Sequence, residues 1–213
     1  MSLFRKLICL AAGVGAMALV SGANAADEGF VGGKFTCLQF TSGLGGSSSG
    51  KLPSDLARLW VVGYLSGYYK AQGSLAFSED AADRQSFNEA LNAKCKEFGK
   101  SSILGVSMNA LSKEARKIPS VAGADFTPTT YKCGQHVDAK AGPAADANKA
   151  DLAELWAFAF IQGYKNVASP NMEIGNENMP PLLGAINNNC AKNRDTLFMD
   201  LTALVAEKVK IAE

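Results

Sequence analysis

The chain has 213 residues, of which 47% are hydrophobic and 19% charged, and its 21 basic and 20 acidic side chains give a formal net charge of +1. This near balance argues against a nucleic-acid-binding protein, which needs a concentrated basic face. After the N-terminal segment, no stretch approaches the roughly 18 consecutive apolar residues of a membrane-spanning helix, so we expect no stable membrane insertion.

The N-terminus has the pattern of an export signal. Arg5 and Lys6 precede an apolar run over residues 7–20 that is too short to span a bilayer, and residues 23–25 read Ala-Asn-Ala. This small-x-small triplet is typical of a signal peptidase site. We therefore expect residues 1–25 to be a signal peptide that is removed, and the mature chain to be periplasmic or secreted.

The next segments have a helical pattern. Residues 35–40 form a short apolar anchor, and residues 43–50 form a loop rich in Gly and Ser. Pro53 suits the first turn of a helix, and small or apolar residues follow it at helical spacing. We expect three main helices in this part of the chain, over residues 53–72, 82–96 and 101–118, the last of them ended by Pro119.

The rest of the chain repeats this plan. After a linker at residues 119–130, residues 131–133 form a second anchor and residues 139–150 a polar loop rich in Ala. Three helices follow, which we expect over residues 150–168, 180–192 and 195–211. Because few segments show the alternation typical of strands, the sequence predicts an all-α protein.

A repeated sequence explains this parallel. Residues 56–68 return 96 residues later as residues 152–164, and six of the 13 positions are identical. The cysteines follow nearly the same offset, from Cys37 to Cys133 and from Cys95 to Cys190. We interpret the chain as a duplication of one unit. It predicts two tandem small helical domains, residues 26–120 and 121–213, each with three main helices and one disulfide.

The cysteines support this interpretation. Four of them follow the expected signal peptide and allow three pairings. Only Cys37 with Cys95 and Cys133 with Cys190 treats both copies alike, so we expect these two disulfides. Each copy is close to the lower size limit for an independent core, and exported domains of this size commonly rely on disulfides. A bridge that closes a loop of roughly 58 residues adds about 4 kcal/mol to the free energy of unfolding in the loop-entropy model.

Catalytic motifs are scarce. The only histidine, His136, follows Cys133 by three residues, which places a base near a thiol. However, Cys133 is needed for the disulfide, and the first copy has Phe40 at the place of His136. One histidine with bonded cysteines cannot supply a zinc site. We therefore expect neither an enzyme nor a bound metal or cofactor.

Small residues recur on the central helix of each copy. Gly63 and Gly67 are four residues apart, and Ala159 and Gly163 match them in the second copy. Glycine inside a helix costs about 1 kcal/mol relative to alanine. Its use in both copies indicates a close approach, either by another helix or by the disulfide.

These motifs resemble those of the HdeA/HdeB family. The resemblance rests on Cys37, the pattern Trp60-x-x-Gly63-Tyr64-x-x-Gly67 and Cys95, and in the second copy on Cys133, Trp156, Gly163-Tyr164 and Cys190. Members of this family are small helical periplasmic proteins with one disulfide, known as acid-stress chaperones. The chain is also similar to the Rap1a/Tai family of periplasmic immunity proteins, which share helices, disulfides and Gly-Tyr-x-x-Gly patterns.

The first resemblance implies a chaperone that opens in acid. Below pH 3 about 20 carboxylates lose their charge, and the positive charge that remains loosens the helix contacts. Unfolding client proteins would then bind an apolar face formed by Leu56, Leu59, Trp60, Tyr64, Leu152, Leu155, Trp156 and Phe160. The chain would act as a monomer with pseudo-dimeric domains or as a homodimer. The alternatives are an immunity or inhibitor protein with one specific partner and a structural envelope-stress protein.

Overall fold

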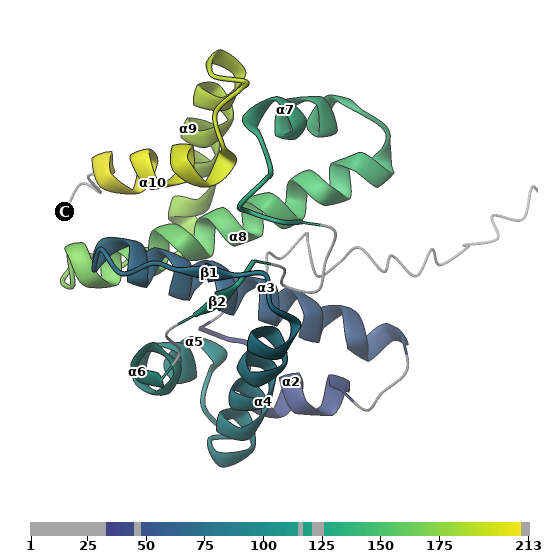
Figure 1. Ribbon diagram of the computed structural model, residues 1–213, viewed down its shortest axis with the longest axis vertical. Helices are drawn as coiled ribbons and strands as arrows, with labels where there is room; N and C mark the ends of the chain where they lie inside the picture. Colours follow the sequence, from purple (N-terminus) through teal and green to yellow (C-terminus); the bar gives the residue numbers. More distant parts are fainter. Residues whose placement is uncertain (1–32, 45–47, 115–116, 121–125, 210–213) are drawn as a thin grey trace, which may run out of the picture.

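The computed structural model describes residues 33–44, 48–114, 117–120 and 126–209 (Figure 1). The expected signal peptide, residues 1–25, lies outside this part of the chain. We call the described residues up to 120 the first half and those from 126 onward the second half. Among the helices that the structure describes, none combines the length and the hydrophobicity needed to cross a bilayer.

The described residues are mostly helical, which confirms the expected all-α class. The first half contains α2 (Cys37–Leu44), α3 (Ser48–Ala71), α4 (Ala81–Glu97), α5 (Ile103–Val106), the π-helix η1 (Ser107–Leu111) and α6 (Ser112–Glu114). The second half contains α7 (Cys133–Ala141), α8 (Ala144–Ala168), the 3-10 helix η2 (Asn176–Asn178), α9 (Met179–Lys192) and α10 (Phe198–Lys208). Two very short strands, β1 (Phe77–Ser78) and β2 (Ile118–Pro119), pair in parallel.

The two longest helices, α3 and α8, pack against each other at the centre of the molecule. Figure 1 shows the remaining helices of the first half on one side of this pair and those of the second half on the other. The hydrophobic core is continuous through the pair and includes fully buried residues of both halves, among them Trp60 and Trp156. The division into two domains therefore stays a prediction, because the halves share one core.

Glycines allow the backbones of α3 and α8 to touch. A Cβ atom added at Gly67 would overlap the carbonyl oxygen of Phe160, and one added at Gly163 would overlap that of Tyr64. The two contacts are equivalent under the 96-residue offset, so the helices meet in a reciprocal way. The close approach expected from the glycine pattern is thus an approach of helix to helix.

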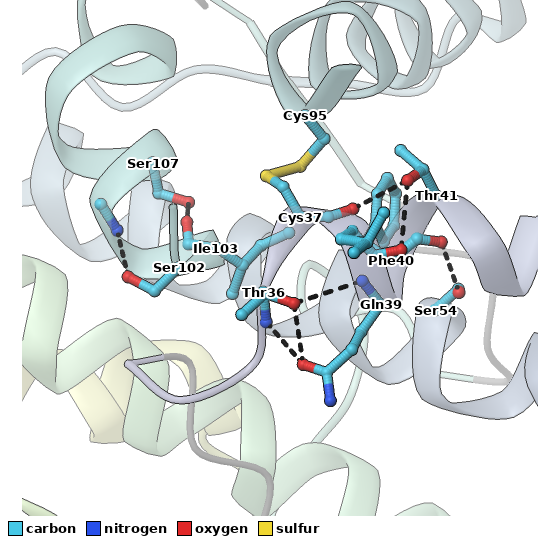
Figure 2. Close-up of a disulfide and its surroundings, with 12 residues drawn as sticks. Thr36, Cys37, Gln39, Phe40, Thr41, Ser54, Cys95, Ser102, Ile103 and Ser107 are labelled. Carbon is cyan, nitrogen blue, oxygen red and sulfur yellow. Dashed lines mark hydrogen bonds between the residues drawn. A yellow bond between two sulfur atoms is a disulfide. The ribbon is translucent and has the colours of Figure 1, made fainter. Parts of the chain in front are cut away.

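Each half has its own disulfide, with the pairing expected from the repeat. Cys37 joins α2 to Cys95 on α4, and Cys133 joins α7 to Cys190 on α9. Figure 2 shows the first bridge, beside which Ser54 on α3 donates a hydrogen bond of 3.0 Å to the carbonyl of Phe40. The short helix of the first half is therefore fixed to both longer helices.

The backbone around the two disulfides repeats as well. The N–H of Cys37 donates to Ser101 and that of Ile103 to Phe35. In the second half the equivalent bonds run from Cys133 to Thr196 and from Phe198 to Tyr131. The antiparallel bridges repeat in the same way, joining Thr36 to Ser102 and Lys132 to Leu197. Both copies of the sequence repeat thus fold into the same local arrangement.

The described residues of two expected loops are largely helical. The apolar anchors are the starts of α2 and α7, α3 already begins at Ser48, and α7 and α8 take up most of residues 139–150. The break between them is confined to Gly142 and Pro143. Alanine is the best helix former, so an Ala-rich polar segment extends a helix readily. The expectation of three main helices in each copy therefore missed the short first helix.

The helix expected over residues 101–118 is confirmed in part. Residues 103–114 form one helical run, in which α5, η1 and α6 follow one another without a gap, whereas Ile118 and Pro119 belong to strand β2. The N–H of Ile118 donates to Ala76 at 3.0 Å, and Pro119 next to it cannot continue a helix. The equivalent helix of the second half, α10, is uninterrupted between Phe198 and Lys208.

The reciprocal glycine contact can be tested by adding one methyl group. Gly163→Ala places a Cβ against the Tyr64 carbonyl, so we expect a loss of about 1–3 kcal/mol in the free energy of unfolding. Gly184→Ala on α9 is the matched control, since a Cβ there meets nothing within 4 Å and alanine favours the helix. Urea unfolding followed by circular dichroism measures both. Equal stabilities of the two variants would contradict the contact.

Candidate functional site

The apolar face expected to bind clients lies in the core. Leu59, Trp60, Tyr64, Trp156 and Phe160 are buried, with at most 1% of each residue exposed. The three other residues of the face are only partly buried (Leu56, Leu152 and Leu155). All eight lie on α3 or α8, so the structure brings the two copies of the face into one region. Binding through this face requires the core to open.

Aromatic contacts occupy this region. Trp60 stacks on Tyr64, with 5.4 Å between the ring centroids and 18° between the planes. Trp156 contacts Phe160 at 5.1 Å and Phe126 at 5.8 Å. Such aromatic pairs add about 0.5–1.5 kcal/mol each to the stabilisation from buried area. Opening the core would expose large apolar surfaces on both central helices.

Beside this face, four polar residues form a cluster that the sequence did not indicate. Lys140 on α7 donates to Glu154 Oε1 on α8 at 2.6 Å, and Asn187 Nδ2 on α9 donates to the same oxygen at 3.0 Å. His136 Nε2, on α7, lies 2.7 Å from Asn187 Oδ1 and 3.6 Å from Glu154 Oε1. We call these four residues the Glu154 cluster. It joins the short helix, the central helix and the disulfide-bonded helix of the second half.

The hydrogen bonds define the form of His136. A carboxylate only accepts hydrogen bonds, so the amide nitrogen of Asn187 faces Glu154 and its oxygen faces the imidazole. His136 must then donate from Nε2, which leaves Nδ1 unprotonated in the neutral ring. Nδ1 is buried and has no hydrogen-bond partner among the described residues.

The contacts of Glu154 change its acidity. Burial alone would raise the pKa of the carboxyl, but the hydrogen bonds from Lys140 and Asn187, together with the His136 ring 3.6 Å away, lower it to about 2, well below the ordinary 4.5. The side chain is 13% exposed, so water screens these interactions only in part. Glu154 therefore remains charged in acid that neutralises ordinary carboxylates.

The thiol and base considered in the sequence are not a reactive pair. Cys133 is bonded to Cys190, and the His136 ring is completely buried against Phe198 at 4.7 Å. Among the described residues, no three His, Cys, Asp or Glu side chains are grouped in a way that would hold a metal ion. The partners of His136 lie on α8 and α9, far away in the sequence, so the Cys-Gly-Gln-His segment alone could not predict them.

An open hollow of about 400 Å³ lies between the two halves, where Leu104 and Met108 approach the C-terminal part of α8 and the segment after it. Two buried polar atoms in its wall, Tyr64 Oη and Gln162 Oε1, have no hydrogen-bond partner among the described residues. Burial raises the pKa of Tyr64, so its hydroxyl stays protonated. Because neighbouring atoms cover both oxygens, a molecule in the hollow would not reach them, and we assign no ligand to it.

Comparisons with protein-family models, curated proteins and solved structures found no match to this chain. The HdeA/HdeB and Rap1a/Tai resemblances therefore rest on the motifs quoted above, and the functions that they imply stay predictions. The structural observations that bear on function are the buried apolar face and the Glu154 cluster.

The Glu154 cluster predicts a specific loss of stability in acid. Because the folded-state pKa of Glu154 is lowered, its charge stabilises the fold above pH 4.5, and this contribution is lost as the pH falls through about 2. The shift corresponds to about 3 kcal/mol. We expect Glu154→Gln to lose a stabilisation of this order at neutral pH. Its free energy of unfolding should then change less with pH between 4.5 and 2 than that of the wild type. Urea unfolding across this range measures the effect.

Asp151→Asn is the control for this measurement. Asp151 lies on the same helix but is exposed, so removing its charge should leave the pH dependence nearly unchanged. If the free energy of unfolding of both variants changed with pH as it does in the wild type, the Glu154 cluster would not contribute to the loss of stability in acid.

Proposed function

We propose that this chain is an exported acid-stress chaperone that binds unfolding proteins through the apolar face of α3 and α8. The observation that carries this proposal is the burial of both copies of the face in one core, beside a backbone contact between two helices. Separation of α3 from α8 would uncover both copies at once. The neutral form would thus keep the binding surface covered.

The charge of the chain supplies a driving force for opening in acid. Protonation of about 20 carboxylates leaves the mature chain with 19 basic side chains and few negative partners, because Arg5 and Lys6 belong to the expected signal peptide. Repulsion among these charges favours an expanded state, and the positive charge would also keep a complex with clients dispersed. The two disulfides limit the expansion within each half, since each fixes the short helix to its neighbour.

Export is part of the proposal. Two disulfides fit an oxidising compartment such as the periplasm, where bridges form and persist. The expected signal peptide would direct the chain there. In this setting the protein would meet external acid directly and would not need a cofactor.

A specific partner at neutral pH is the second candidate, in keeping with an immunity or inhibitor protein. Leu38 and Phe98 are 65% and 41% exposed. The N–H of Leu38 donates to the Gly99 carbonyl at 2.9 Å, so the start of α2 lies beside the end of α4. Contiguous exposed apolar patches are common at protein contacts. A partner bound there would not require the core to open.

Acid titration tests the chaperone function directly. We expect the purified mature protein to bind a hydrophobic dye and to suppress aggregation of an acid-denatured client near pH 2–3, but to do neither at pH 7. Light scattering by the client and dye fluorescence are the two measurements. A chain that neither binds the dye nor protects the client in acid would exclude this function.

Two leucine variants test whether the proposed face is the binding surface. Leu155→Ser alters a partly buried residue of the face, whereas Leu204→Ser alters an exposed residue of α10 outside it. We expect the first to reduce client protection at pH 2–3 and the second to leave it unchanged. Equal protection by both variants would remove the face from the proposal.

A further inference from the structure

The two halves also differ where the short helix meets the central helix. In the first half, the Arg58 guanidinium on α3 lies 5.5 Å from the centre of the Phe40 ring on α2. The 96-residue offset places His136 at the position of Phe40 and Glu154 at the position of Arg58. The same contact between helices is therefore made by a ring and a cation in one half and by two titratable groups in the other.

We infer that acid loosens the second half before the first, because protonation of the Glu154 cluster weakens the contacts among α7, α8 and α9, whereas the Phe40–Arg58 contact is insensitive to acid. This inference concerns the regulation of the proposed chaperone, and its biological meaning rests on that function. The structural argument itself depends only on the contacts in the two halves.

The negative charge of Glu154 balances the positive charge of Lys140 beside it. Lys140 faces it from α7 and His136 lies beside it, while α9 contributes the neutral Asn187. Burial and the negative charge of Glu154 both raise the pKa of Tyr131, which precedes α7. Among the described residues, no charged side chain of α3 or α10 forms an ion pair with Glu154. Protonation of Glu154 thus leaves the Lys140 ammonium without its counter-charge.

At the equivalent position of the first half, the central helix has Arg58 in place of a carboxylate. Arginine stays protonated at all pH values relevant here, and Phe40 does not titrate. Asp55 pairs with Arg58 at 2.9 Å, but its side chain is 22% exposed, against 13% for Glu154. Asp83 has a lowered pKa through hydrogen bonds with Ser78 and Lys117, but this pair is exposed and screened by solvent.

Hydrogen exchange of the full-length mature chain, resolved by peptide mass, tests the order of opening. Exchange is measured from pH 5 to pH 2 and corrected for the intrinsic rate at each pH. We expect protection in α7 and α9 to fall by about a hundredfold between pH 4.5 and 2, ahead of any comparable loss in α2 and α4. Loss in both halves at one pH, or earlier loss in the first half, would overturn the inference.

Two variants connect the order to the cluster. Glu154→Gln should already have weak protection in α7 and α9 at pH 5 and little further loss in acid. Lys140→Gln retains the carboxylate but weakens its stabilisation, so the loss in α7 and α9 should move to higher pH. Lys117→Gln, which removes the partner of Asp83 in the first half, is the control and should leave α7 and α9 unchanged. An unchanged transition in Lys140→Gln would overturn the role of the cluster, even if Glu154→Gln failed to fold.

A client-aggregation assay at the same pH values separates this inference from the proposed function. Ordered opening without client protection would support the acid-sensitive cluster and contradict the chaperone. Client protection with simultaneous opening of both halves would support the chaperone function. It would contradict the inference that the Glu154 cluster sets the order of opening.

Discussion

The backbone contact between α3 and α8 at Gly67 and Gly163 determines how the halves are joined. Each disulfide lies within one half, so neither links the halves to each other. The central helices touch where any side chain larger than a hydrogen atom would meet a carbonyl group. Glycine weakens an isolated helix by about 1 kcal/mol relative to alanine. At these positions the close packing of two long helices offsets that cost, and one core extends across the contact.

The proposed binding face must be buried to stabilise the fold, but it must be exposed to bind a client. Trp60 and Trp156 contribute to stability only while they are covered, but they can contact a client only when the core opens. The disulfides reconcile these demands in part. They keep α2 joined to α4 and α7 joined to α9, so the loss of contact between α3 and α8 need not unfold each half completely. A reversible opening is easier to achieve in such a chain because the unfolded state is constrained.

The sequence predicted features that depend on periodicity and repetition. The offset of the cysteines matches the observed bridges, and α4 begins and ends within one residue of its expected bounds. The short helices α2 and α7 were missed because helices of 8 and 9 residues carry too little periodic signal. The Glu154 cluster was missed for a different reason. His136 and Asn187 are 51 residues apart and Asn187 and Glu154 are 33 apart, so only the packing of α7, α8 and α9 brings them together.

The equivalent bonds of the two halves separate the part of the repeat that is the same in both from the part that differs. The capping bond from the N–H of residue 36 to Gln39 recurs from the N–H of Lys132 to Gln135, with a distance of 2.8 Å in both. The side chains that hold the short helix on the central helix nevertheless differ in chemistry, with Phe40 and Arg58 in one half and His136 and Glu154 in the other. Because the backbone frame and the disulfide already place the short helix, this contact is free to differ. The difference then changes how each half responds to protons without changing its fold.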